Sequence, residues 1–163
     1  MVKRGQAILY LLLLTVFIGC KSDPCEETKC YEGECLDGTC ICNPGFEGSD
    51  CSIKMVTKFV GSWAATDDCD NDLNNYTAII SASSQTIDQL ILTNMAGLGS
   101  LNTVVAVLNT STSVAIASQD GGNGTLVSGT GTISTGGTQI TWIYELKFLP
   151  DSVVSCTATW SLQ

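Results

Sequence analysis

Regular alternation of apolar and polar residues near the end of the chain predicts β-strands. Along residues 139–148 every second side chain is large and apolar: Ile140, Trp142, Tyr144, Leu146 and Phe148. The final segment follows the same rule, with Val154, Cys156, Ala158, Trp160 and Leu162 alternating with serine and threonine. Because successive side chains of a strand point to opposite faces, each segment is expected to bury one face and to expose the other.

Shorter segments with β-type composition precede these two strands. They are separated by Asp/Asn-rich or Gly-rich stretches and lie near 57–66, 76–82, 89–93, 103–109, 113–118 and 126–134. Residues 52–163 are therefore predicted to form an all-β domain, a β-barrel or β-sandwich of about eight strands.

A different pattern occupies residues 25–51, where apolar residues are few and six cysteines are closely spaced: Cys25, Cys30, Cys35, Cys40, Cys42 and Cys51. So short a segment buries too little apolar surface to fold alone, so that disulfides must replace a core. Such bonds persist in oxidising compartments, which predicts an exported protein. A zinc site is the alternative for Cys40 and Cys42, but it suits an exported chain without histidine poorly.

The run Cys40-Ile41-Cys42-Asn43-Pro44-Gly45-Phe46, with Cys51 five residues later, resembles the end of an EGF-like module. Spacing alone leaves 15 ways to pair six cysteines. The resemblance implies Cys25–Cys35, Cys30–Cys40 and Cys42–Cys51, and an EGF-like domain over 25–51. Its third loop is short, unlike the loop of the calcium-binding members of that family.

The first 20 residues have the order of an export signal: Lys3-Arg4, an apolar run from Ala7 to Ile18, and then Gly19-Cys20. Phe17-Ile18-Gly19-Cys20 resembles a bacterial lipobox, which implies a signal peptide over 1–19, lipidation of Cys20 and a short tether over 20–24. Lipidation also accounts for the odd ninth cysteine. The alternative is a secretory signal cleaved near Gly19 that leaves Cys20 free or paired between chains.

Two cysteines then remain, Cys69 after the first strand of the β domain and Cys156 in the last, and we predict that they form a disulfide. A disulfide requires Cα atoms within about 7 Å. The first and last strands must therefore be neighbours or face one another, as in a closed up-and-down barrel or a small sandwich.

Charge and composition exclude several functions. From Cys20 onward the chain has five lysines, no arginine and all 16 acidic residues, a formal charge of −11. Such a surface lacks the basic stripe that nucleic-acid binding requires. No histidine is present, so Ser-His-Asp and Cys-His relays are impossible. A carboxylate-based glycosidase remains the minor alternative to a protein that is not an enzyme and has no cofactor.

Gly61-Ser62-Trp63 resembles the G-x-W signature of lipocalin-like barrels, although the late-strand arginine of that family is missing. Barrels of this size either fill their interior or hold one small ligand. The candidate pocket residues are Trp63, Trp142, Tyr144, Phe148 and Trp160, with Met95–Gly99 as a cap over the mouth. The alternative for the tryptophans is plain core packing.

Asp68, Asp70 and Asp72 alternate in a stretch rich in oxygen ligands, which makes them a weak calcium candidate. The spacing is not that of an EF-hand, because Leu73 and Ile79 stand at the glycine and glutamate positions. Asp and Asn are also ordinary residues of solvated turns, and this is the favoured interpretation.

The whole chain resembles EGF-containing lipoproteins of Bacteroidetes. We therefore expect a lipid-anchored protein of the cell envelope, at the outer membrane or the cell surface, that acts as a binding or adhesion module with an EGF-like stalk. Its partner is an unknown protein, glycan or small apolar ligand. The alternative is a lipocalin-like carrier with an apolar or sugar-like ligand inside the barrel, and the two differ in whether the core is filled or open.

Overall fold

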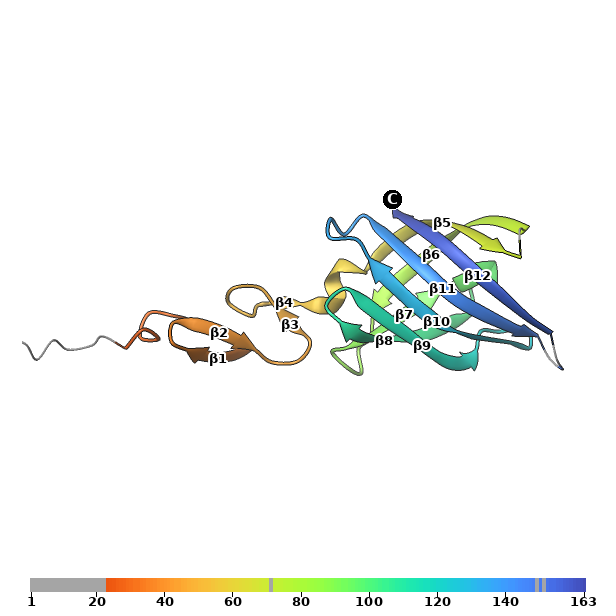
Figure 1. The fold of residues 1–163 in the computed structure, drawn as a ribbon. Helices are drawn as coiled ribbons and strands as arrows, with labels where there is room; N and C mark the ends of the chain where they lie inside the picture. The colour runs from red at the N-terminus through yellow and green to blue at the C-terminus, as the bar shows by residue number, and fades with distance from the viewer. Residues whose placement is uncertain (1–22, 71, 149, 151) are drawn as a thin grey trace, which may run out of the picture.

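The computed structural model describes residues 23–70, 72–148, 150 and 152–163. The predicted signal peptide, Cys20 and most of the tether lie outside the described residues. The described chain forms a small disulfide-rich part followed by a closed eight-stranded barrel (Figure 1). The fold is mainly β. Of the two predicted architectures, a barrel and a sandwich, the structure contains the barrel.

The N-terminal part, called the module here, comprises residues 23–54. It contains two short antiparallel ladders, one from β1 (Gly33–Leu36) and β2 (Thr39–Cys42), the other from β3 (Phe46–Glu47) and β4 (Ile53–Lys54). Three disulfides crosslink the module: Cys25–Cys35, Cys30–Cys40 and Cys42–Cys51. These are the pairs implied by the EGF-like resemblance.

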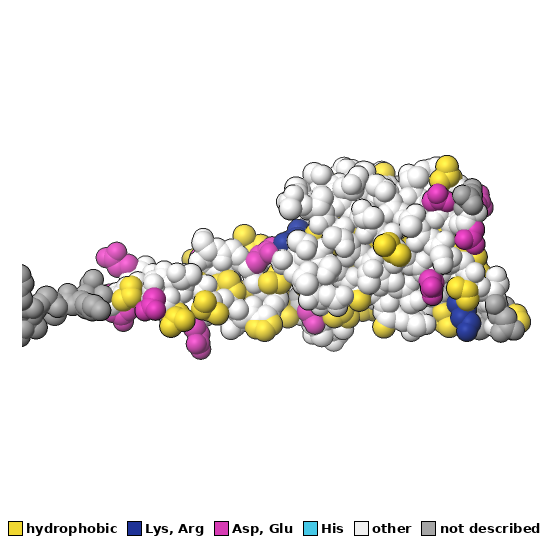
Figure 2. All heavy atoms as spheres, in the orientation of Figure 1, with side chains coloured by type: hydrophobic (Ala, Val, Ile, Leu, Met, Phe, Trp, Pro, Cys, Tyr) yellow, Lys and Arg dark blue, Asp and Glu magenta, His cyan; other side chains and the backbone are white. Residues whose placement is uncertain are grey.

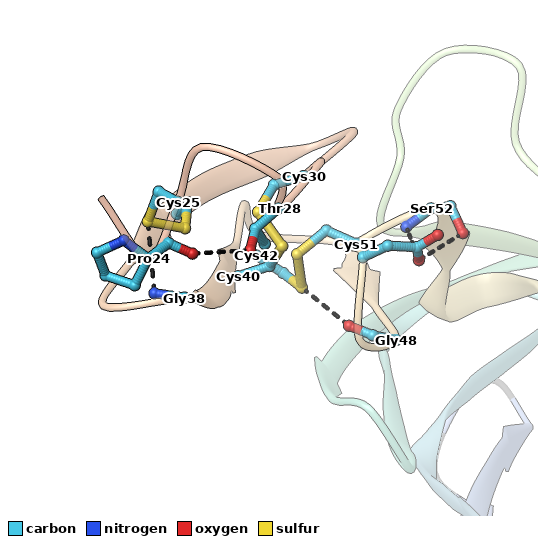
Figure 3. The surroundings of a disulfide bond; sticks show 12 residues. Pro24, Cys25, Thr28, Cys30, Gly38, Cys40, Cys42, Gly48, Cys51 and Ser52 are labelled. Atoms are coloured by element: carbon cyan, nitrogen blue, oxygen red, sulfur yellow. Dashed lines mark hydrogen bonds between the residues drawn. A yellow bond between two sulfur atoms is a disulfide. The ribbon is translucent and has the colours of Figure 1, made fainter. Parts of the chain in front are cut away.

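Local hydrogen bonds support the module around its sulfur atoms. The Gly38 N–H donates to Cys25 Sγ at 3.4 Å and the Thr28 hydroxyl donates to the Pro24 carbonyl at 3.2 Å (Figure 3). Cys51 is the only buried residue described between 23 and 54. The sulfur bridges therefore occupy the place that a hydrophobic core takes in a larger domain.

The barrel strands follow one another up and down. They are β5 (Gly61–Cys69), β6 (Asp72–Ala82), β7 (Gln89–Thr93), β8 (Thr103–Thr110), β9 (Ser113–Asp120), β10 (Thr125–Ile133), β11 (Gln139–Phe148) and β12 (Ser152–Leu162). Each pairs antiparallel with the next, and β12 pairs with β5 to close the barrel. Cys69 and Cys156 lie directly opposite each other in that last ladder and form a disulfide. The predicted pairing and the adjacency of first and last strands are thus both present.

One boundary prediction was wrong. The segment 57–66 was expected to be the first strand, but Met55–Lys58 forms a 3₁₀ turn, η1, and β5 runs from Gly61 to Cys69. The reason is packing: Val56 and Phe59 are buried in the barrel mouth, and the Trp63 indole N–H donates to the Phe59 carbonyl at 2.9 Å. The chain therefore plugs this end of the barrel before it enters the sheet.

The two ends of the barrel differ. The module end is where β5 begins and β12 ends. The far end is opposite and holds the Cys69–Cys156 bridge, the segment 94–102 with the 3₁₀ turn η2 (Met95–Gly97), and the loop 121–124. Val56 and Phe59 cover the module end, whereas Met95, Ala96 and Leu98 cover the far end.

Candidate functional site

The barrel interior is filled by aromatic and aliphatic side chains. Trp63, Trp142 and Trp160 are each 0% exposed, and the ring centroids of Trp142 and Trp160 are 5.2 Å apart. No space large enough for a water molecule therefore borders these three side chains. Gly131 faces Trp142 across the β10–β11 ladder, and a Cβ at that position would lie 2.6 Å from the indole ring.

The predicted pocket residues are therefore only partly brought together. Trp63, Trp142, Tyr144 and Trp160 belong to one buried cluster. Phe148 was expected to point inward with them, but it is 39% exposed because it lies where β11 passes the rim of the barrel. Leu162, at the end of β12, was also expected to face inward, and it is exposed for the same reason. Two of the hollows in the structure lie where the module meets the barrel. Two others lie on the outer face of the barrel strands.

A carboxyl group lies inside the far half of the barrel. Asp67 is 1% exposed, because the alternation of β5 turns Trp63, Ala65 and Asp67 toward the interior. The hydroxyls of Tyr76 and Tyr144 both donate to its Oδ2, at 2.8 and 2.5 Å. The other oxygen, Oδ1, has no hydrogen-bond partner in the structure. Buried polar atoms almost always have a partner, so Asp67 is an exception that calls for an explanation.

The surroundings of Asp67 favour its neutral, protonated form more than water does. Burial raises the pKa of Asp67, while the hydrogen bonds from Tyr144 and Tyr76 and the nearby Trp160 indole act in the opposite direction. The Trp160 indole N–H acts on the Asp67 carboxyl as a hydrogen-bond donor, although the pair does not meet the geometry of an ordinary hydrogen bond. Burial also raises the pKa of Tyr76 and of Tyr144 above the ordinary tyrosine value. Both hydroxyls therefore keep their protons and act as donors to Asp67.

The segment predicted as a cap does cover this group. Met95 is buried, and Ala96 and Leu98 pack against the core. The Ala96 N–H donates to the Tyr76 hydroxyl at 2.9 Å, and that hydroxyl in turn donates to Asp67. The backbone here is unusual, because Asn94 and Ala96 have φ values of 62° and 58°. Left-handed conformations are costly for a residue with a Cβ, so the cover is held in a strained arrangement.

The weak calcium candidate is not brought together. Asp68 is on the outer face of β5, opposite Leu73, whereas Asp70 and Asp72 belong to the hairpin that follows. Within the described residues, no group of three acidic, cysteine or histidine side chains is arranged to hold a metal. The acidic residue that matters was instead the one just before them, Asp67. Asp67 follows Trp63 and Ala65 at two-residue spacing, which places all three on the same face of the strand. Its inward position was missed because the strand was expected to end at residue 66.

Comparisons with known proteins add little. No protein-family model matches the chain, and no curated protein is similar to it. Among solved structures, one similar chain is a protein of unknown function from Bacteroides ovatus, crystallised at 2.40 Å resolution. It is 14% identical with a TM-score of 0.43, and the match covers 63% of this chain and 41% of that one. Among the described residues, no helix is both long enough and apolar enough to cross a membrane.

Proposed function

We propose that this protein is a non-catalytic binding or adhesion protein of the cell surface, held to a bilayer by lipid on Cys20. In this proposal residues 25–51 are an EGF-like stalk, and the barrel is the part that meets a partner. The observation that carries it is the filled barrel core, which directs recognition to the outer surface.

Contacts between the module and the barrel support the role of a stalk. The Met55 N–H donates to the Gly45 carbonyl at 2.9 Å, and Lys58 Nζ lies 2.6 Å from Glu47 Oε1. Gly45 also fits closely against the barrel, since a Cβ there would lie 3.0 Å from Ile87 Cγ1. The module extends from one end of the barrel (Figure 1), so that the far end is remote from the N-terminal part of the described module.

The far end carries exposed apolar side chains that a binding surface would use. Leu101 is 95% exposed in the segment between β7 and β8, and exposed apolar side chains also lie where β6, β11 and β12 reach this end: Leu73, Phe148 and Val153. Figure 2 shows hydrophobic and charged side chains at this end, whereas most of the visible barrel face is uncharged. Exposed apolar side chains of this size are available for contact with a partner.

Lipidation is tested by mass spectrometry of the full chain made in a bacterial host with a lipoprotein pathway. We expect a mature N-terminus at Cys20 that carries diacylglycerol, and a Cys20→Ala variant that lacks it and leaves the membrane fraction. An unmodified Cys20 in the exported protein would contradict the anchor.

Recognition is tested with arrays of glycans and matrix proteins. The double variant Leu73→Ser/Leu101→Ser should lose binding, whereas the matched change Leu36→Ser/Ile41→Ser on the exposed face of the module should keep it. The opposite result would move the binding surface from the barrel to the module.

A lipocalin-like carrier is the second candidate function. The closed eight-stranded barrel is compatible with it. The interior would have to open for a ligand to enter, because the tryptophans leave no space between them. Tryptophan fluorescence during a screen of lipids, sugars and small amines tests it, and a flat response throughout argues for a permanently filled core.

A further inference from the structure

The ladder of the barrel is incomplete along one strand of the far end. β6 pairs with β5 over residues 72–80, but it pairs with β7 only over residues 79–82. Among the described residues, the part of β6 before Ile79 therefore has a neighbouring strand on one side only. This stretch is an edge within an otherwise closed barrel, and an edge presents backbone donors and acceptors to other chains.

The direction of the backbone groups shows which of them face the missing neighbour. Asn94 follows β7 on the side of β6 away from β5, and its Nδ2 donates to the Thr77 carbonyl at 2.8 Å. Alternate residues of a strand point their backbone groups to the same side, so the N–H and C=O groups of Leu73 and Asn75 point away from β5 as well. Within the described part of the chain, none of these four groups has a partner.

Another place where barrel strands separate is closed by a side chain. β8 and β9 pair only near the turn that joins them. Beyond that ladder, the Val105 N–H donates to Gln119 Oε1 at 2.8 Å, and Gln119 Nε2 donates to the Val105 carbonyl at 2.7 Å. Both backbone groups of Val105 are therefore satisfied within the chain. On β6 the Asn94 side chain takes only the Thr77 carbonyl, so the rest of that edge stays open.

The edge also lacks the features that commonly protect such strands. Lysine, proline and β-bulges hinder pairing with other chains, and residues 73–78 contain none of them. Leu73 is 67% exposed, and Asn75 is exposed with it. An extended segment can therefore add to β6 as a further strand, with main-chain hydrogen bonds to Leu73 and Asn75.

The charge around the edge restricts that segment. Asp70 and Asp72 are exposed at the turn where the edge begins, and the chain from Cys20 onward has a formal charge of −11. A segment that carries lysine or arginine is attracted to this end, whereas a second copy of this chain brings another acidic surface. The exposed Leu73 side chain would lie beside the added strand, and cross-strand contacts of this kind favour a β-branched or aromatic residue.

We propose that residues 73–77 of β6 form a docking edge for an extended, basic segment of a partner protein, which adds to the barrel as a further strand. This inference rests on the proposed binding function of the barrel and deepens it, because it names the kind of partner and the strand that the partner meets. It does not depend on lipidation or on an open barrel interior.

The test selects peptides from a phage-displayed random library on the oxidised mature protein. We expect the enriched peptides to alternate β-branched and basic residues. The synthetic form of the most enriched peptide should protect the Leu73 and Asn75 amides from hydrogen exchange, measured by NMR. Methylation of the peptide's backbone nitrogens that face β6 should weaken binding by about tenfold or more, and methylation of the intervening nitrogens should not. No enrichment, or a peptide that leaves both amides unprotected, overturns the inference.

Two substitutions at one position separate the backbone from the side chain. Asn75→Pro removes the edge N–H, which β5 does not use, and should weaken peptide binding by about tenfold or more. Asn75→Ala keeps that N–H and should bind as the parent does, although both variants lose the hydrogen bond from the Thr66 hydroxyl. Equal affinities of the two variants would overturn the docking edge. If Asn75→Pro folds poorly, Leu73→Pro and Leu73→Ala make the same comparison two residues earlier.

The remaining outcomes separate the docking edge from the proposed function. Self-association in sedimentation experiments that Asn75→Pro abolishes would assign the edge to a second copy and overturn the partner segment. Binding that survives Asn75→Pro but is lost in Leu73→Ser/Leu101→Ser would overturn the edge and leave the proposed binding surface standing. If the parent protein bound neither array components nor peptides, both would be removed.

Discussion

The module and the barrel solve the same stability problem by different means. In the module, Cys51 is the only buried residue described, and three disulfides close loops with sequence separations of 9 or 10 residues. In the barrel, one cluster joins 22 of the described residues, and a single disulfide spans a separation of 87. The comparison shows how chain length sets the choice: a segment too short to bury apolar area depends on covalent bonds, and a longer one adds a bond to a core that already exists.

Reduction of the disulfides should have the most different effects on the module and on the barrel. Each short bridge of the module is worth about 2–3 kcal/mol in the loop-entropy model, and no core remains to compensate for its loss. We expect a strong reductant to unfold residues 25–51 while the barrel keeps its strands. Hydrogen exchange followed by mass spectrometry checks this, and a module that stays protected after full reduction would contradict the comparison.

Removing the barrel disulfide should cost stability without abolishing the fold. In the Cys69→Ser/Cys156→Ser variant, we expect the free energy of unfolding to fall by about 4–5 kcal/mol, because the denatured chain regains a long open loop. Urea denaturation of the oxidised proteins measures the difference. An unchanged midpoint would mean that the bridge adds nothing to the core.

A cavity made in the barrel core tests whether close packing stabilises the barrel. Trp142→Ala should destabilise the barrel by about 3–5 kcal/mol, because it removes a fully buried ring and leaves a cavity next to Trp160. Ile143→Ala, the next residue on the exposed face, is the control and should change stability by less than about 0.5 kcal/mol. Equal effects would mean that the interior is not closely packed.

The smallest expected effect is a change in how stability depends on pH. The pKa of Asp67 is raised in the folded state, so the folded protein holds this proton at pH values where the unfolded chain has released it. Its contribution to stability is therefore complete below the ordinary carboxyl pKa of about 3.9 and is lost as pH rises from there through the folded pKa. Asp67→Asn should remove this loss. The difference between the two proteins in urea melts from pH 4 to 7 measures it, and two parallel curves would show that the pKa of Asp67 is not raised.

The prediction from sequence was most accurate where one face of a strand is strictly apolar. The segments 89–93 and 139–148 have the predicted boundaries, and the other strands after the first agree within a few residues. Predictions failed at the strand ends, as at Phe148 and Leu162, because periodicity says which face a residue takes but not where the rim of the barrel lies. The first strand was placed too early because Val56 and Phe59 are apolar for another reason, to plug the barrel mouth.

Cysteine positions and two-residue periodicity, both local properties, were enough to predict two parts, an all-β domain and the four sulfur pairs, three of them through resemblance to a known module. Only the closed barrel brings Asp67, Tyr76 and Tyr144 together, because they lie on three different strands, two of them far apart in the chain. The filling of the interior was likewise decided by the tertiary structure. Whether large side chains leave a pocket depends on how they pack against one another across the barrel, which alternation along a single strand does not contain.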